Sequence, residues 1–503
     1  MNKYKKLAMN TFIFAVGNFG SKILVYLLSY LYSKYLSPSD SSTKELLEIT
    51  ANFLLPIFTL SITEAIIRYG LDNNYDKREV FTSATCLCGL GLISMLVFSP
   101  LFHFLSFVNG YTVLLLVYVC TSAFRSLCSQ FVRARGLVKL FSFDGILTTL
   151  VLFLLNIVFI AHFKLGVSGF MLSVILSDFF SAVFLFVTAG LWKYLKINYF
   201  NKELSRVMLR FSLPLIPTIL MWVITGFSDR LFIRYMHSDT VQLGQAAAGL
   251  YGYATKVPNL ISMVSTIFFQ AWNMSAITED DSDDRDSFYE NVFDFNQSLL
   301  YILVAGCLLI VQPVTNFWIG ADFRDCVKYS PIIIYATIYS CFTTFMGSIY
   351  LASKQTKRSL FTSLVSGVIN VGLNVILIPR IGLYGPPIST VAAYMTVFII
   401  RAIDSRKLVP FRIDMKKMIV NNIVILVMMF ICLFETDLMH HLPLYAIVTL
   451  LFFAVFILNR KAVESIFYKV LPARIASHFV SLSTAKLCAV IGGLAVFVLI
   501  DLL

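Results

Sequence analysis

The chain has 503 residues, of which 58% are hydrophobic and 14% charged, and its formal net charge at pH 7 is +12. Soluble domains carry about a quarter of charged residues, so this sequence cannot cover a water-exposed surface of the size its length requires. The apolar residues fall in runs of roughly 18–30, which is long enough for a helix to cross a bilayer. The composition therefore excludes an ordinary soluble protein and predicts an all-α polytopic membrane protein.

The apolar runs predict about fourteen transmembrane helices. In chain order they are 8–36, 45–69, 80–107, 111–135, 140–163, 166–192, 207–236, 244–277, 287–318, 327–352, 357–379, 382–403, 415–434 and 442–459. The first run is too long for a cleavable signal, so we expect it to be retained. The tail 461–483 reads as an amphipathic segment at the interface. Residues 485–503 are either a fifteenth span or a second surface helix.

The basic residues report orientation rather than nucleic-acid binding, because they are spread over alternate loops. If the N-terminus with Lys3, Lys5 and Lys6 is cytoplasmic, about 29 Lys and Arg residues fall on the cytoplasmic side and about 5 on the other. The few on the other side are Lys44, Lys164, Arg324, Lys328 and Arg380. A missed helix in mid-chain would destroy this alternation, so it supports both the helix count and a cytoplasmic N-terminus.

An internal repeat divides the chain. Residues 139–173 and 357–389 both start with basic residues, carry an Asn in the apolar run, and continue with Gly-x-x-Gly and a Ser four residues later. A weaker match pairs Pro56 with Pro258, each inside a span. Paired interruptions of this kind are typical of transporters, although simple packing kinks explain them equally well. We therefore expect six-helix lobes at 1–205 and 206–410, two added helices at 411–460, and a tail at 461–503.

Ionisable residues inside spans are costly and mark candidate functional positions. The cationic candidates are Lys22, Arg125, Arg230, Arg234 and Lys256, and Asn18 lies on the helical face of Lys22. The acidic candidates, for ion pairing or for proton or sodium coupling, are Glu64, Asp178 and Asp229. The cations outnumber the carboxylates, which favours a cavity for an anion such as a phosphate. The alternative is that Asp178 or Asp229 simply pairs with an Arg.

No metal site or cofactor is expected. Cys86 and Cys88 lack a second ligand pair, and the cysteines fall in apolar runs as small buried residues do. We interpret the acidic loop 279–284 as a solvent-exposed loop rather than a metal site. Outer loops are too short for a catalytic domain, so we expect a protein that is not an enzyme.

Three segments resemble the polysaccharide-export flippases of the multidrug/oligosaccharidyl-lipid/polysaccharide exporter superfamily. Residues 209–236 are similar to the family's seventh helix, with its Pro-x-x-Pro and Asp-Arg, and residues 249–270 to its eighth. Residues 350–390 are similar to its tenth-to-twelfth helix segment, with Gly385-Pro386-Pro387 in place of the usual Gly-Ala-Ala. The likeness extends over roughly residues 1–460, although its motifs are diffuse.

The resemblance implies a MATE-like pair of six-helix lobes around a cavity in a bacterial inner membrane. It implies a cargo of undecaprenyl-pyrophosphate-linked oligosaccharide for O-antigen or capsule, flipped to the outer leaflet by alternating access. The headgroup contacts would be Lys22, Arg125, Arg230 and Lys256, and the partners would be membrane lipid and polysaccharide polymerase machinery. Three alternatives stay open: an ion-coupled multidrug exporter, a peptidoglycan lipid-precursor flippase, and a membrane-embedded polymerase or ligase.

Overall fold

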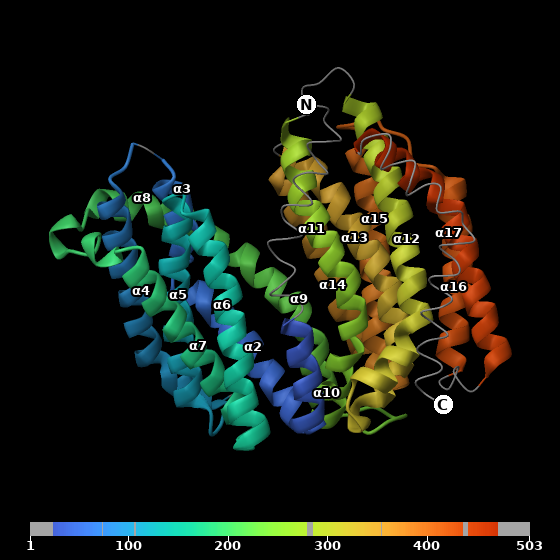
Figure 1. Cartoon of the computed structure of the whole chain (residues 1–503), viewed down its shortest axis with the longest axis horizontal. Coiled ribbons are helices and arrows are strands. Elements are labelled where there is room, and N and C mark those ends of the chain that lie inside the picture. Colours follow the sequence, from blue (N-terminus) through green and yellow to red (C-terminus); the bar gives the residue numbers. More distant parts are fainter. Residues whose placement is uncertain are drawn as a thin grey trace. The chain divides into compact units, whose positions relative to one another are not determined.

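The computed structural model describes residues 24–72, 74–104, 107–278, 285–353, 355–435 and 441–470. Every regular element in these residues is a helix (Figure 1). Within them, nine apolar segments are long enough to cross a membrane, and the bent pair α2–α3 forms a tenth. One of the nine, 358–405, contains two helices, α14 and α15. The predicted fold class, an all-α polytopic membrane protein, is confirmed.

The chain divides into two compact units, each described here by itself. The N-terminal unit holds residues 24–236 and 243–252. After a helical stretch at 24–35 its elements are α2 (Pro38–Phe58), α3 (Ile62–Gly70), α4 (Lys77–Phe98), η1 (Ser99–Phe104), α5 (Thr112–Ala134), α6 (Val138–Asn156), η2 (Ile157–His162), α7 (Gly166–Thr188), η3 (Leu191–Lys193), η4 (Ile197–Tyr199), α8 (Lys202–Ser212), α9 (Leu215–Tyr235) and most of α10 (Gln245–Ala254). Packing thus groups α9 with the first unit, and the division into six-helix lobes at residue 205 stays a prediction.

The C-terminal unit holds residues 237–242 and the described residues from 253 to 470. Its elements are α11 (Lys256–Thr278), α12 (Arg285–Trp318), η5 (Ala321–Lys328), α13 (Ser330–Ala352), α14 (Thr356–Ile381), η6 (Gly382–Tyr384), α15 (Gly385–Ser405), α16 (Met415–Phe434) and α17 (Leu442–Val470). These helices stand side by side in one bundle (Figure 1). Helix α17 runs past the expected end at 459, because the first proline after it is Pro472 and nothing earlier stops the helix. The rest of the predicted tail, 471–503 with its possible fifteenth span, lies outside the described residues.

Three of the predicted spans are each built from two helices. Span 45–69 is α2 and α3, span 207–236 is α8 and α9, and span 244–277 is α10 and α11. The first break bends the chain by 58° just after Pro56. There Leu60 and Ser61 take left-handed backbone angles, φ 56° and 49°, and the Ser61 N–H donates to the Pro56 carbonyl at 2.9 Å. The expected interruption of this span is therefore present, three to five residues after Pro56, and the backbone at the break is bonded locally.

The two copies of the sequence repeat fold alike. In each, a glycine with positive φ lies at the turn between two helices. In the first copy η2 ends at His162 and α7 begins at Gly166 (φ 56°), and in the second α14 ends just before Gly382 (φ 57°) and α15 begins at Gly385. The two serines at matching positions, Ser173 and Ser389, are fully buried, and each hydroxyl donates to the carbonyl four residues earlier. A side chain at these turn glycines would strain the backbone. The pairs α6–α7 and α14–α15 are thus the same structural unit, used once in each unit of the chain.

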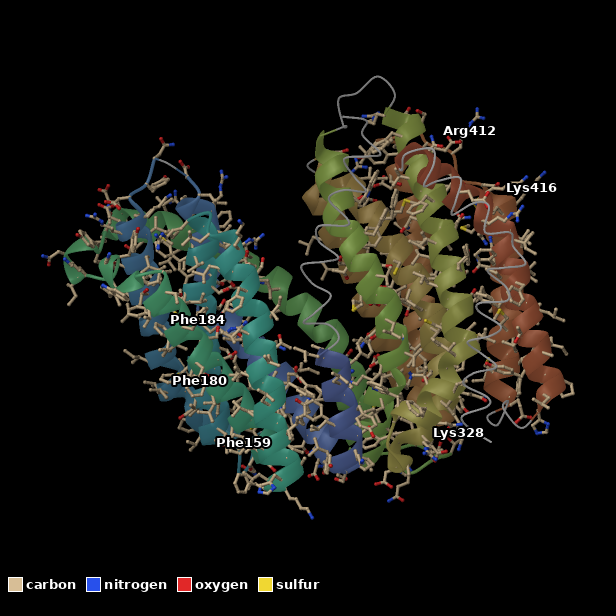
Figure 2. All side chains as sticks on the ribbon, in the orientation of Figure 1. Phe159, Phe180, Phe184, Lys328, Arg412 and Lys416 are labelled. Atoms are coloured by element: carbon tan, nitrogen blue, oxygen red, sulfur yellow. The ribbon has the colours of Figure 1, made fainter. Side chains whose placement is uncertain are left out.

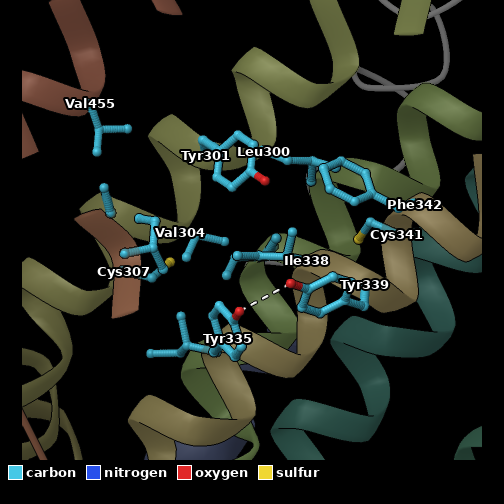
Figure 3. Close-up of a cluster of buried hydrophobic side chains, with 14 of the residues drawn as sticks. Leu300, Tyr301, Val304, Cys307, Tyr335, Ile338, Tyr339, Cys341, Phe342 and Val455 are labelled. Carbon is cyan, nitrogen blue, oxygen red and sulfur yellow. Dashed lines mark hydrogen bonds between the residues drawn. The ribbon is translucent and has the colours of Figure 1, made fainter. Parts of the chain in front are cut away.

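Polar side chains attach α16 to the helices around it. Lys417 Nζ lies 2.6 Å from Asp294 Oδ1 of α12, and Asn421 exchanges amide hydrogen bonds with Asn459 of α17. The next residue, Asn422, donates to the Tyr301 hydroxyl of α12 at 2.6 Å. On α13 the hydroxyls of Tyr335 and Tyr339 both donate to Asn422 Oδ1. The two hydroxyl oxygens lie 3.0 Å apart (Figure 3). Such hydrogen bonds between helices are favourable where no water competes.

The outward surfaces of both units are apolar. Phe180 on α7, for instance, is 53% exposed (Figure 2), and large aliphatic and aromatic residues are exposed along most of the helices. A face of this kind suits contact with lipid chains. Arg412 and Lys416 lie at one end of the C-terminal bundle and Lys328 at the other (Figure 2). That separation agrees with the loops to which the charge pattern assigns them.

Gly91 provides a test of how α4 packs against the bent end of α2. A Cβ at Gly91 would lie 1.8 Å from the Phe58 carbonyl oxygen, whereas one at Gly89 would meet nothing within 4 Å. We expect Gly91→Ala to lower the free energy of unfolding by about 3 kcal/mol, because the backbone of α2 must move. Gly89→Ala should be neutral or slightly stabilising, by up to about 1 kcal/mol. Thermal unfolding of the two purified variants in detergent measures the difference, and equal midpoints would contradict this packing.

Candidate functional site

The first group of buried charges in the N-terminal unit is the Arg125 cluster, made of Ser122, Arg125, Asp144, Asp178 and Ser181. It joins the middle of α5 to α6 and α7. Arg125 Nη1 lies 3.3 Å from Asp178 Oδ1, and Nη2 lies 3.9 Å from Asp144 Oδ2. Its Nε donates to Ser181 Oγ at 3.1 Å. One guanidinium group therefore lies between two carboxylates from different helices.

Hydroxyl groups complete the contacts of both carboxylates. Ser181 donates to Asp144 Oδ1 at 2.7 Å, and Ser122 donates to Asp178 Oδ2. The Asp side chains are 1% and 8% exposed, while that of Arg125 is 31% exposed. The formal charge of the cluster is −1 when both carboxylates are ionised, and an uncompensated charge at such a position is costly. The sequence-predicted pair Arg125 and Asp178 is thus brought together, with Asp144 as a third member.

The second group is the Arg230 cluster, made of Glu45, Asp229, Arg230, Arg234 and Tyr251 on α2, α9 and α10. Arg230 Nε lies 2.9 Å from Glu45 Oε2, with both side chains mostly buried. Asp229 is nine-tenths buried and accepts a hydrogen bond from the Tyr251 hydroxyl at 3.4 Å. The salt bridge between Arg230 and Glu45 therefore joins α9 to α2.

Two glycines on α10 allow α2 to approach closely. A Cβ at Gly249 would lie 1.9 Å from the Pro38 carbonyl oxygen, and one at Gly252 would lie 2.3 Å from Glu45 Oε2. Gln245, one turn earlier, donates to Thr43 Oγ1 at 2.6 Å. The close approach places the Glu45 carboxylate against α9 and α10, where it meets Arg230.

Arg234 lies one turn after Arg230 on α9, and its contacts are of a different kind. Its Nη1 lies 3.4 Å from Ser42 Oγ and 3.5 Å from Thr43 Oγ1, and its guanidinium lies 5.7 Å from the centres of the Phe107 and Tyr235 rings. Within the described part of the chain no carboxylate pairs with it. Arg234 is therefore a cation held by hydroxyls and aromatic rings, and its charge is not neutralised by a salt bridge there.

The remaining predicted residues are dispersed. Lys256 belongs to the C-terminal unit, where its Nζ lies 5.5 Å from the centre of the Tyr253 ring. Glu64 is exposed on α3 and makes no ion pair with a described residue. Lys22 and Asn18 lie outside the described residues, as does the acidic loop 279–284.

Sequence reasoning missed Glu45 and Asp144. Both lie inside predicted spans, so the rule that selected Asp178 applies equally to them. With both included, the two clusters contain four carboxylates and three guanidinium groups, listed as Glu45, Asp144, Asp178 and Asp229 against Arg125, Arg230 and Arg234. The expected surplus of cations is therefore not found within these two clusters.

Arg401 on α15 is a further buried cation, which the sequence pattern did not single out. Its Nε donates to Thr362 Oγ1 and its Nη1 to the Thr343 carbonyl, both at 2.9 Å. Its Nη2 reaches the Ser359 carbonyl at 3.3 Å, and Gly347 leaves room for the guanidinium. These contacts join α13, α14 and α15 and indicate a structural role.

Comparison with known proteins places the fold. No family model matches the sequence. An uncharacterised membrane protein of Methanocaldococcus jannaschii is 24% identical over 263 residues, which cover 48% of this chain and 59% of that protein. The match thus spans about three fifths of the length of that relative.

Two solved structures are much more completely covered. The lipid II flippase MurJ, in an inward closed conformation, has a TM-score of 0.68 over 91% of this chain and 99% of its own, at 15% identity. An inward-facing multidrug resistance MATE family transporter of the MOP superfamily has a TM-score of 0.64 over 81% of this chain and 99% of its own, also at 15% identity. This chain has the fold of the MOP-superfamily transporters. Its apolar helices make it a multi-pass membrane protein.

A double-mutant cycle on Glu45 and Arg230 tests the second cluster. Either Glu45→Gln or Arg230→Gln leaves a mostly buried charge without its partner, and we expect each to lower the free energy of unfolding by about 3 kcal/mol. The double variant should lose less than the sum by at least about 1 kcal/mol. Arg234→Gln is the matched control on the same helix and should cost under about 1.5 kcal/mol. Additive losses in denaturation of the detergent-solubilised protein would show that the two groups do not interact.

Proposed function

We propose that this chain is a flippase that moves undecaprenyl-pyrophosphate-linked oligosaccharide units from the cytoplasmic to the outer leaflet for O-antigen, capsule or a similar surface polysaccharide. It works in the bacterial inner membrane by alternating access, with its N-terminus in the cytoplasm. The cargo is released unchanged to the polymerase machinery. No covalent step is required, so the protein contributes binding, shielding of charge and a change of conformation.

One observation carries the proposal. The flippase structure covers a tenth more of this chain than the MATE transporter does, with a higher TM-score. A tenth of the chain is about the combined length of α16 and α17, which have 20 and 29 residues. The extra coverage is long enough for one further pair of helices, and we take it as support for a lipid-linked cargo over a drug.

Cations in and near the spans support an anionic headgroup. Arg234 has no carboxylate partner among the described residues, and its contacts are hydroxyls and aromatic rings. Guanidinium groups bind phosphate oxygens through paired hydrogen bonds. We infer that Arg234, Lys256 and Lys22 contact the pyrophosphate, whereas Arg125 and Arg230 must first give up bonds to Asp or Glu.

One observation favours a second candidate, an ion-coupled multidrug exporter. The Arg125 cluster holds one carboxylate more than it holds cations, which suits a positively charged ligand. A deletion strain that becomes sensitive to cationic drugs and keeps its surface polysaccharide would favour the exporter. Loss of the polysaccharide with unchanged drug sensitivity would favour the flippase. A third candidate, a peptidoglycan-precursor flippase, is separated by comparing the two lipid-linked cargoes in one reconstituted assay.

The cationic mechanism predicts the behaviour of single variants in proteoliposomes. Lys22→Ala, Arg234→Ala and Lys256→Ala should each slow flipping of a lipid-pyrophosphate-linked oligosaccharide about tenfold, since a charge-assisted hydrogen bond contributes about 1.5 kcal/mol or more. Lys416→Ala, an exposed lysine at the start of α16, is the control and should flip normally. Unchanged flipping when Lys22→Ala and Arg230→Ala are combined would contradict the mechanism.

A further inference from the structure

The Arg125 cluster has an internal charge mismatch that the proposed function does not use. Asp144 and Asp178 come from α6 and α7, and both face one guanidinium on α5. With both carboxylates ionised, a cluster whose two aspartates are almost wholly enclosed by the helices carries one net negative charge. Buried groups in that situation take up a proton rather than remain charged. The cluster is therefore neutral with one proton bound and positive with two.

The hydrogen bonds show how unevenly the two carboxylates are supported. One carboxylate oxygen of Asp178 accepts a hydrogen bond from Arg125, and the other accepts one from Ser122. Asp144 Oδ1 accepts hydrogen bonds from the hydroxyls of Ser181 and, at 3.5 Å, Thr148. The other oxygen, Oδ2, has one contact, with Arg125 Nη2 at 3.9 Å. That second oxygen is the one with room for a proton of its own.

Other titratable groups lie close to the cluster. Tyr118 on α5 is within electrostatic reach of Asp178 and also of Glu48 on α2, and Cys128 on α5 is within reach of Asp144. Glu48 is itself paired with Lys44 at 2.9 Å. Among the described residues of α3, α4 and the short helices around α5 and α7, we find no ionisable side chain bonded to the cluster. The two aspartates are thus the acidic groups in direct contact with Arg125.

We propose that Asp144 and Asp178 form a proton-binding pair that controls Arg125, so that proton uptake releases its guanidinium to bind a phosphate. The proposal deepens the proposed function and rests on it for the identity of the phosphate. Arg125 is the exposed member of the cluster, with 31% of its side chain accessible against 1% and 8% for the aspartates. When the second carboxylate is protonated the guanidinium has no anionic partner left in the cluster. A phosphate then replaces the lost charge.

The linkage has a fixed direction. If binding of phosphate is accompanied by uptake of a proton, lowering the pH must tighten phosphate binding, and phosphate must raise proton affinity by the same factor. For one proton per phosphate the apparent affinity changes by up to about tenfold per pH unit. The same site therefore couples a proton to the headgroup without a separate ion channel.

The test measures binding of undecaprenyl pyrophosphate to the detergent-solubilised full chain between mildly acidic and mildly alkaline pH. We expect the wild type to bind more tightly as the pH falls. Asp144→Asn and Asp178→Asn, which imitate the protonated groups, should bind about tenfold more tightly at the alkaline end, and the pair together should abolish most of the pH dependence. Arg125→Gln should bind weakly at every pH. Asp322→Asn, an exposed aspartate of η5, is the control and should behave as the wild type.

Infrared titration of the ligand-free protein provides a second measurement. The carboxylic acid C=O band should grow as the pH falls and should shrink in each Asp→Asn variant. If the lipid does not bind at all, the proposed function fails, yet the infrared band still reports whether the pair takes up a proton. If the lipid binds with the same pH dependence in the double Asp→Asn variant, or if the variants leave the band unchanged, the proton switch is wrong and the flippase proposal is untouched. Variants that elute as aggregates are replaced by Asp→Ser at the same positions, with the same expected loss of pH dependence.

Discussion

A charge buried among apolar helices needs an opposite charge or several hydrogen bonds, and much of the internal packing described here follows from that requirement. Arg401 meets it with hydroxyls and carbonyls from two neighbouring helices, α13 and α14. Arg230 meets it with Glu45, which reaches it because glycines on α10 let α2 come close. Arg125 has two carboxylate partners, Asp144 and Asp178. The first solution uses only neutral hydrogen-bond partners, whereas the other two use carboxylates.

The same requirement explains why the helices break where they do. Backbone groups freed by a proline or a turn must be bonded again within the protein, since lipid offers no partner. After Pro56 the chain does this with the Ser61 N–H, which donates to the Pro56 carbonyl. The repeated use of one turn in both units suggests that packing of the helix pair, more than the cargo, determines this part of the sequence.

Hydropathy predicted the membrane class, and the matching glycine and serine motifs predicted the two repeat copies, because these follow from local composition and spacing. They could not predict that three spans are each divided in two, since a proline fixes where a helix weakens but not where it ends. The sequence also could not predict which charged residues pair with one another. Asp178 and Arg125 are 53 residues apart and Arg230 and Glu45 are 185 apart, so only the packing of α2, α5, α7 and α9 joins them. Glu45 and Asp144 were missed for a simpler reason, because acidic residues inside predicted spans were not all counted.

The amide pair that joins α16 to α17 has a consequence for the history of this protein. Asn421 and Asn459 are both fully enclosed, and each satisfies the other. Each amide also donates to a carbonyl of its own helix, Lys417 or Val455, so replacing one of them by a hydrocarbon side chain leaves the oxygen of the other without its donor, whereas replacing both at once removes the problem. Among relatives that keep these two helices, positions 421 and 459 are therefore expected to change together or not at all. Such paired change would record that the two helices were acquired and retained as one piece.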